Sequence, residues 1–274
     1  MVNSQEKRMS RSRKILIFDN TFLLTEHLLK MWIEIAQQSI ARNNRFTVAL
    51  SGGRSPMEFY CKLSAYKDFD LWKRTHIFLG DERFVSHDDQ NSNFKMIKQN
   101  LLDYANIPPE NIHPIITDTK NVEQSADHYK NTLVHFFEFK GNAPCFDLIL
   151  LGIGSDGHTA SLFPDDKNID DPKSLVLPVS LPHLKEERIS MALPVINNAR
   201  NVILLALGAQ KSDIIKEIIK GKGEAPASKV ELTDGQLTYL LDKEAAQRLP
   251  YRDSYSHEGQ AILLQDPDLR SDAT

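Results

Sequence analysis

Short apolar runs alternate along the chain with longer segments in which apolar residues recur every three or four positions. The short runs are rich in Leu and β-branched residues, as buried strands are, and the longer segments have the period of amphipathic helices. Since such helices connect parallel strands, the pattern predicts an α/β fold with a mainly parallel sheet covered on both faces. The predicted strands are Lys14–Phe18, Arg45–Leu50, His76–Leu79, Phe146–Leu151, Arg188–Leu193 and Asn201–Leu207.

Six longer segments are predicted to be helices. The first carries Leu24, Leu28, Met31, Ile35 and Ser39 at three-to-four spacing, which predicts a stripe that faces the core. The predicted helices are Thr21–Ala41, Pro56–Ala65, Ser92–Leu102, Val122–Phe139, Lys211–Ile219 and Lys243–Leu249.

The order of these elements predicts one domain over residues 14–249, with no internal repeat and no interdomain linker. Residues 1–13 form a basic arm that we expect to be flexible. Residues 250–274 are rich in Asp, Ser, Gln and Pro and are expected to be partly disordered. Within that tail, only Ala261–Leu264 is apolar enough to pack against the domain.

The composition is that of an ordinary globular protein, with 41% hydrophobic and 26% charged residues in 274. A formal net charge of -4 provides no overall attraction for nucleic acid or an anionic membrane, so an anionic substrate requires a local cationic pocket. Two cysteines without paired spacing favour a reducing compartment, and we expect a cytoplasmic location. No apolar stretch approaches the ~20 residues that span a bilayer. No obligate protein partner is indicated.

The segment Ser51–Pro56 (SGGRSP) follows a predicted strand and opens a predicted helix. Ser55 is expected to cap this helix, with Pro56 in the first helical position and Glu58 completing a capping box. The glycines allow close approach of a ligand, the helix N-terminus favours an anion, and Arg54 adds positive charge. Two explanations of this segment stay open: a phosphate-binding loop and an ordinary strand-to-helix turn.

The segment Gly152–Thr159 (GIGSDGHT) follows another predicted strand. Its glycines match the spacing of a dinucleotide-binding turn, but Pro164 and a loop interrupt the helix which that motif requires. It also matches a nucleoside-triphosphate loop, except that His158 replaces the essential Lys. Asp156 and His158 remain, at the end of a strand where open parallel sheets place active sites. The imidazole can accept a proton near neutral pH and the carboxylate can orient it, although a structural turn would use the same residues.

Further polar side chains lie at other strand ends. The segment Gly80–Val85 (GDERFV) contains Asp81 and Arg83, while Arg188 begins a predicted strand and Lys211 lies at a strand-to-helix junction. Each of these residues could be an exposed surface charge. Together with Arg54, the cations could instead form the pocket that an anionic substrate requires.

Five segments resemble the 6-phosphogluconolactonase family in order and spacing. The resemblance covers about residues 14–249, and the string DGHTASLFP is highly specific. Two departures are small: Ser86 stands where the family usually has Pro, and Tyr239 where Trp is common. The segments are SGGRSP (51–56), DER (81–83) with SN (92–93), GIGSDGHTASLFP (152–164), GAQK (208–211) and PASKV (226–230).

The resemblance implies a Rossmann-like three-layer α/β/α sandwich, shared with glucosamine-6-phosphate deaminases, and neither a metal nor a cofactor. The implied reaction is hydrolysis of 6-phospho-D-glucono-1,5-lactone to 6-phospho-D-gluconate, a step of the oxidative pentose phosphate pathway. His158 would be the general base that activates water, with Asp156 as its support. The substrate would be bound by Ser51, Gly52, Gly53, Arg54, Asp81, Arg83, Gly154, Arg188 and Lys211. Of these, Gly52, Gly53, Arg54, Arg188 and Lys211 would hold the phosphate, while Asp81 and Arg83 would face the sugar or the phosphate.

Two alternatives remain. A deaminase or isomerase of the related class has a similar Asp-Gly-His turn but places a catalytic Glu near the position of Phe163. A non-catalytic phosphosugar-binding module would keep the glycines and cations but lose the proton-transfer group. A serine esterase and a zinc hydrolase are disfavoured, because the sequence contains neither a G-x-S-x-G elbow nor an H-E-x-x-H pair.

Overall fold

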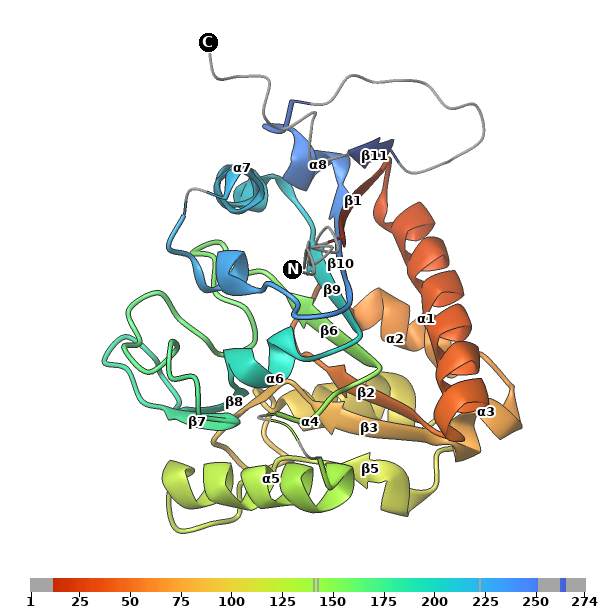
Figure 1. The fold of residues 1–274 in the computed structure, drawn as a ribbon, viewed down its shortest axis with the longest axis vertical. Coiled ribbons are helices and arrows are strands. Elements are labelled where there is room, and N and C mark those ends of the chain that lie inside the picture. The colour runs from red at the N-terminus through yellow and green to blue at the C-terminus, as the bar shows by residue number, and fades with distance from the viewer. Residues whose placement is uncertain (1–11, 140, 142, 222, 251–261, 265–274) are drawn as a thin grey trace, which may run out of the picture.

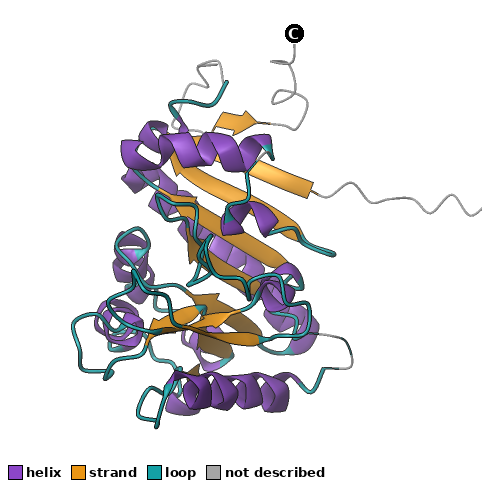
Figure 2. Ribbon diagram, turned by 90° about the vertical axis from the view of Figure 1, so that its left-hand side faces the viewer, coloured by secondary structure: helices purple, strands orange, loops and turns teal. Residues whose placement is uncertain are grey.

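The computed structural model describes residues 12–139, 141, 143–221, 223–250 and 262–264. A twisted eight-stranded sheet forms the centre of the molecule (Figures 1 and 2). Seven of its strands are parallel, and the edge strand β11 runs antiparallel to β1. From one edge to the other the strands are β11 (Ile262–Leu264), β1 (Ser12–Phe18), β10 (Gln236–Asp242), β9 (Asn201–Ala206), β6 (Leu148–Gly152), β2 (Phe46–Leu50), β3 (Thr75–Leu79) and β5 (Ile112–His113).

Helices cover both faces of this sheet, so the predicted three-layer α/β/α sandwich is confirmed. In Figure 1, α1 (Thr21–Asn43), α2 (Met57–Ser64) and α3 (Phe69–Lys73) lie on one side, and α6 (Leu193–Asn197) and α7 (Ser212–Lys220) on the other. Three further helices and four short helical turns complete the helical elements of the described residues. These are α4 (Asn93–Ile97), α5 (Val122–Phe137), α8 (Lys243–Ala246), the π-helix η1 (Lys98–Leu102) and the 3₁₀ turns η2 (Pro109–Asn111), η3 (Ala209–Lys211) and η4 (Pro226–Lys229).

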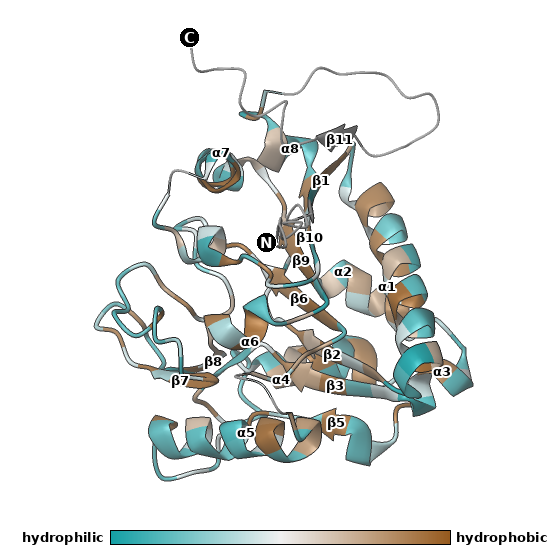
Figure 3. Cartoon of the chain, in the orientation of Figure 1, coloured by the Kyte–Doolittle hydropathy of each residue, from teal (hydrophilic) through white to brown (hydrophobic). Residues whose placement is uncertain are grey.

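The core lies between the sheet and its helices. All five residues of β2 are buried, and Figure 3 shows the central strands as predominantly hydrophobic. On α1, Leu24 and Leu28 are buried as predicted, but Met31 and Ile35 are only partly buried. Trp32 and Ala36 are buried in their place, each one position after the predicted residue. The core-facing residues follow a four-residue step through most of this helix.

A second, three-stranded antiparallel sheet lies beside the main one: β4 (Asp81–Arg83), β8 (Arg188–Met191) and β7 (Val176–Val179). The prediction that Arg188–Leu193 is a strand of the parallel sheet is therefore wrong. The strand ends at Met191, because Leu193 begins α6 with Pro194 in its first turn. The predicted strands also omitted β10, a central parallel strand whose Thr238 is buried among apolar residues.

The two ends of the chain lie mostly outside the described residues, which include neither residues 1–11 nor most of the tail. Strand β1 begins at Ser12, so Arg13 belongs to the sheet and not to the predicted arm. Strand β11 lies within Ala261–Leu264, the part of the tail that was expected to pack. The division of the chain into one domain with two flexible ends stays a prediction.

The order of the strands creates a crevice at the carboxyl ends of β2 and β6. These strands are neighbours, but the chain runs outward from β2 to β3 and, in the opposite direction, from β6 to β9. The loops that follow β2 and β6 therefore leave toward opposite faces. Open α/β sheets bind their ligands at such a reversal of strand order.

Candidate active site

A cavity of about 510 Å³ lies at this reversal point. Its wall contains ten of the eleven residues that the sequence predicted for the site, and Asp156, the eleventh, hydrogen-bonds one of them. Loops that follow strands of the parallel sheet supply most of these residues, while Arg83 and Arg188 come from β4 and β8 of the second sheet. The ten are Ser51, Gly52, Gly53, Arg54, Asp81, Arg83, Gly154, His158, Arg188 and Lys211.

The loop after β2 forms one wall. Gly53 has φ +89°, a backbone conformation that favours glycine. At Gly52 a Cβ atom would lie 1.8 Å from Asn93 Oδ1, so a side chain at that position would displace Asn93. The predicted capping box is wrong: α2 begins at Met57, and Ser55 makes no cap. Instead, Ser55 Oγ lies 3.4 Å from Lys211 Nζ, which faces it across the cavity.

The turn after β6 carries the His–Asp pair. His158 Nδ1 and Asp156 Oδ1 are 2.6 Å apart, and the same oxygen accepts the backbone N–H of His158 at 3.1 Å. The Gly154 N–H donates to the His158 carbonyl at 2.8 Å and closes the turn. A Cβ at Gly154 would lie 2.3 Å from the imidazole, so only glycine allows the ring this position.

The contacts of this pair determine the charge of Asp156. Burial alone would raise the pKa of the Asp156 carboxyl, but the hydrogen bonds and charge of His158 outweigh burial and hold that pKa below its usual range. Asp156 is therefore an anion near neutral pH. Because it accepts from Nδ1, the other ring nitrogen, Nε2, is left for a ligand or water. The Phe163 ring packs against the imidazole with 4.7 Å between centroids.

Two arginines lie side by side in the second sheet. Arg83 on β4 and Arg188 on β8 are paired across the antiparallel ladder. Burial lowers the pKa of Arg188, and the neighbouring Arg83 charge lowers it further. The carboxylates of Asp81, Glu186 and Glu82 oppose this lowering, and a bound anion would add to their effect. This pairing connects parts of the chain that the sequence did not show to be neighbours.

Lys211 approaches the cavity from the opposite side. Burial lowers its pKa, the Asp242 carboxylate opposes that effect, and Arg54 adds to it. Asp242 also accepts the Gly208 N–H at 2.9 Å and caps α8 through the Ala245 N–H at 2.7 Å. Asp242 thus fixes the turn before Lys211 and supplies a nearby negative charge.

Two buried carboxylates shape the remaining wall. Asp81 accepts from Ser161 Oγ at 2.7 Å and is one of the residues that line the cavity. Glu82 is fully buried, accepts three backbone N–H groups and the Ser92 hydroxyl, and so caps α4. Burial raises the pKa of Glu82, while those backbone N–H groups oppose the rise. Glu82 serves the framework, and Asp81 faces the cavity.

Asn93 is a candidate site residue that was not among the predicted ones. Its side chain is 2% exposed and its Nδ2 donates to the Asp81 carbonyl at 3.0 Å, which orients Oδ1 toward Gly52. Asn93 Oδ1, Ser51 Oγ and Arg83 Nε are buried and have no hydrogen-bond partner among the described residues. Since buried polar atoms are normally paired, three such atoms in one cavity indicate a polar ligand. The family-like pair Ser92-Asn93 was the only indication in the sequence.

Other sites can be compared with this cavity. A larger cavity, about 820 Å³, is lined by Arg13, Lys229, Tyr239 and others, but by none of the predicted site residues.

Within the described ranges, no three His, Cys, Asp or Glu side chains are grouped to hold a metal ion. In the same part of the chain, no helix combines the length and apolar character needed to cross a membrane. Independence from metal and cofactor, and the cytoplasmic location, stay predictions.

The fold and the cavity define an α/β protein with a cationic ligand pocket at the carboxyl edge of a parallel sheet. The chain belongs to the family of glucosamine-6-phosphate isomerases/6-phosphogluconolactonase, whose model matches residues 19–239.

Individual relatives support this membership. The chain is 37% identical over 234 residues to the 6-phosphogluconolactonase of Synechocystis, covering 84% of this chain and 95% of that protein. It is 32% identical over 247 residues to the chloroplastic 6-phosphogluconolactonase 3 of Arabidopsis thaliana, covering 86% and 75% of the two chains. The solved structure of 6-phosphogluconolactonase from Trypanosoma brucei superposes with a TM-score of 0.79 at 28% identity, covering 88% of this chain and all of that one.

Proposed function

We propose that the chain hydrolyses 6-phospho-D-glucono-1,5-lactone to 6-phospho-D-gluconate, with His158 as the general base that activates water. Membership in the family, and likeness to 6-phosphogluconolactonases over most of the chain, support the lactone hydrolase activity. The observation that carries the mechanism is the 2.6 Å contact between His158 Nδ1 and Asp156 Oδ1 at the wall of a cationic cavity.

In this mechanism Asp156 keeps the Nδ1 proton in place, and Nε2 accepts a proton from water as the water oxygen bonds to the lactone carbonyl carbon. The tetrahedral intermediate then breaks the bond between C1 and the ring oxygen. The imidazolium returns its proton to that oxygen, which becomes the C5 hydroxyl. The lactone is a reactive ester, so no covalent enzyme intermediate is required. A positioned base of this kind typically contributes ~100-fold to 10,000-fold to the rate.

The cations would hold the substrate by its phosphate. We assign the phosphate to Gly52, Gly53, Arg54, Arg188 and Lys211, because positive charge and a glycine loop meet there in a chain that is otherwise acidic. Of the remaining predicted residues, Ser51 and Gly154 would complete the pocket, and Asp81 would face the sugar or the phosphate. Arg83 lies beside Arg188, so it would contact either the phosphate or the sugar.

The deaminase alternative requires a carboxylate near the position of Phe163. That residue is apolar, and its ring packs against His158. Incubation with glucosamine 6-phosphate should therefore release no ammonia. Ammonia release at a rate comparable to lactone hydrolysis would replace the lactonase proposal with the alternative.

The test generates the labile lactone in place with glucose-6-phosphate dehydrogenase and follows its disappearance. The protein should accelerate hydrolysis above the spontaneous rate, and a folded His158→Asn variant should lose ~100-fold or more in turnover while KM changes little. If the unmodified protein binds the lactone without accelerating its loss, it is a binding module. Near-normal turnover by the variant would remove His158 from the mechanism.

A further inference from the structure

The segment η4 is family-like but has no part in the reaction described above. It lies directly against the turn that carries His158. The Ala227 N–H donates to the Gly157 carbonyl at 3.0 Å, and a Cβ at Gly157 would lie 2.5 Å from the Cβ of Ala225. Gly157 itself has φ +84°. The turn therefore rests on η4 with no room between them, one residue before the imidazole.

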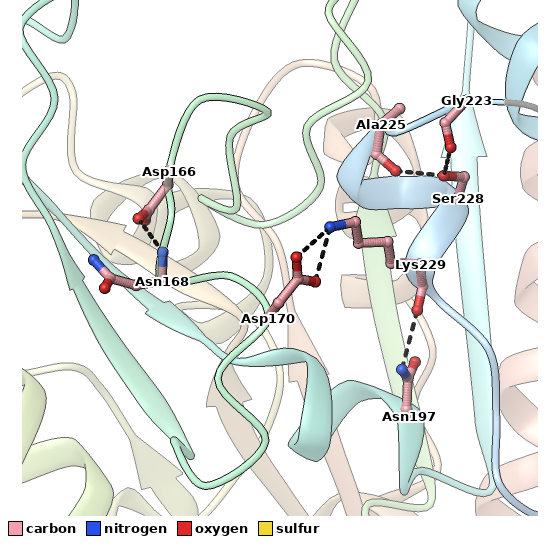
Figure 4. A network of polar contacts seen from close by, with 8 residues as sticks. All are labelled: Asp166, Asn168, Asp170, Asn197, Gly223, Ala225, Ser228 and Lys229. Atoms are coloured by element: carbon pink, nitrogen blue, oxygen red, sulfur yellow. Dashed lines mark hydrogen bonds and ion pairs between the residues drawn. The ribbon is translucent and has the colours of Figure 1, made fainter.

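η4 is itself fixed by polar contacts on both sides (Figure 4). The Ser228 hydroxyl lies 2.6 Å from the Ala225 carbonyl and 2.8 Å from the Gly223 carbonyl, and its single proton is shared between them. The Asn197 amide donates to the Lys229 carbonyl at 3.0 Å. These contacts hold the Ala227 N–H in the direction of the turn.

Lys229 connects η4 to a second support of the imidazole. Its Nζ lies 2.6 and 2.8 Å from the two carboxylate oxygens of Asp170, as Figure 4 shows. Asp170 belongs to the loop 164–172, which begins directly after Phe163. Phe163 packs on the imidazole. His158 is thus held through its turn by η4 and through its ring by Phe163, and the ion pair joins η4 to the loop that follows Phe163.

We propose that η4 is a clamp that positions His158 for proton transfer, with Ser228 and Lys229 as positioning residues. Neither is among the residues that line the cavity of the candidate active site. A general base must lie within hydrogen-bond reach of its water, and small displacements of a catalytic group cause large losses of rate. The proposal rests on the proposed function, since positioning is measured through turnover.

The test compares Ser228→Ala and Lys229→Gln with the unmodified protein. We expect kcat to fall about tenfold for Ser228→Ala and about threefold for Lys229→Gln, with KM changed less than about twofold. Lys229→Arg should restore turnover. In the proton NMR spectrum, the resonance of the imidazole N–H that faces Asp156 should shift or broaden in both variants, because the turn loses its fixed geometry.

Lys98→Gln provides the matched control. It breaks another exposed ion pair, between Lys98 and Asp103 in a region that does not line the cavity, so kcat and the N–H resonance should stay unchanged. An exposed ion pair adds little to stability by itself, so the melting temperatures of the two Lys variants should be similar.

Three outcomes would overturn the clamp. The first is turnover of Ser228→Ala and Lys229→Gln within twofold of the unmodified protein. The second is a rise in KM with kcat unchanged, which would assign the segment to binding. The third is a parallel loss of melting temperature and turnover with the N–H resonance unmoved, which is general destabilisation. If the unmodified protein shows no lactonase activity, the proposed function fails, while the resonance still tests the clamp.

Discussion

Replacing Asp156 by Asn tests whether this residue acts through its charge. In the structure Asp156 Oδ1 lies 2.6 Å from His158 Nδ1 and 3.1 Å from the His158 backbone nitrogen. Asn keeps an oxygen at this position and nearly the same shape, so both contacts can form. The substitution removes the negative charge that faces the imidazole.

The structure allows the size of the effect to be worked out. A hydrogen bond to a charged group contributes ~1.5–3 kcal/mol and a neutral one ~0.5–1.5, so the resting enzyme loses about 1–1.5 kcal/mol at this contact, and kcat falls only by what the transition state loses in addition. The transition state loses more, because the imidazolium that forms there has no counter-charge. The Asp156 side chain is 47% exposed, so water screens part of this additional loss. We expect kcat to fall about 10-fold to 100-fold, with KM changed less than about twofold.

The assay follows the lactone generated in place, at saturating substrate, with the spontaneous rate subtracted. Circular dichroism and the melting temperature confirm that the variant is folded. Because the two residues act as a unit, the double variant Asp156→Asn/His158→Asn should be no slower than His158→Asn alone. Normal turnover of Asp156→Asn, or losses that add in the double variant, would refute the reasoning.

Four further predictions concern the cavity and the framework. Lys211→Gln or Arg188→Gln should weaken binding of the phosphorylated lactone ~10-fold to 100-fold more than that of an unphosphorylated lactone, and equal losses would contradict a phosphate role. Asn93→Ala should raise KM about tenfold through loss of a buried polar contact, whereas a lower melting temperature with KM unchanged would make its role structural. Dialysis against EDTA should leave turnover intact, and activity lost there but restored by a divalent ion would contradict metal independence. Burial, and to a lesser extent the charge of His76, lowers the pKa of His113 to about 4. At His113 the unfolded chain therefore binds more protons than the folded one below pH ~6.5, so this residue should lower the free energy of unfolding by about 1–2 kcal/mol as the pH falls toward 4. Urea unfolding of His113→Gln should show a weaker dependence, and an unchanged one would contradict the assignment.

Much of the candidate site could be predicted because its residues follow strands. Ser51–Arg54 and Asp156–His158 each come after a short apolar run, and the carboxyl ends of parallel strands meet at one edge. The local pattern gave a wrong prediction at Ser55, which does not cap the helix that follows it. A capping box requires the helix to begin directly after the cap, and α2 begins one residue later than the pattern predicted.

Other features depend on contacts between distant parts of the chain. Strand β10 lies between β1 and β9 inside the sheet, where Thr238 is buried, yet Gln236 and Thr238 break up the apolar pattern of its sequence. The pairing of Arg83 with Arg188 follows from the second sheet, which the predicted topology lacked. Asn93 becomes a candidate site residue only because its amide nitrogen is bound to the Asp81 carbonyl.

The sequence by itself determined the fold class, the family resemblance and the chemistry of the Asp156–His158 turn, because hydrophobic period and short motifs are local properties of the chain. Only the tertiary structure decided how far apart the functional groups lie, which polar atoms are left without partners, and which segments support the imidazole. The contact of Ala227 with Gly157 joins two such segments. Neither segment carries a pattern that specifies the other, since a hydrogen bond between distant backbones depends on how the intervening elements pack and not on the side chains at its two ends.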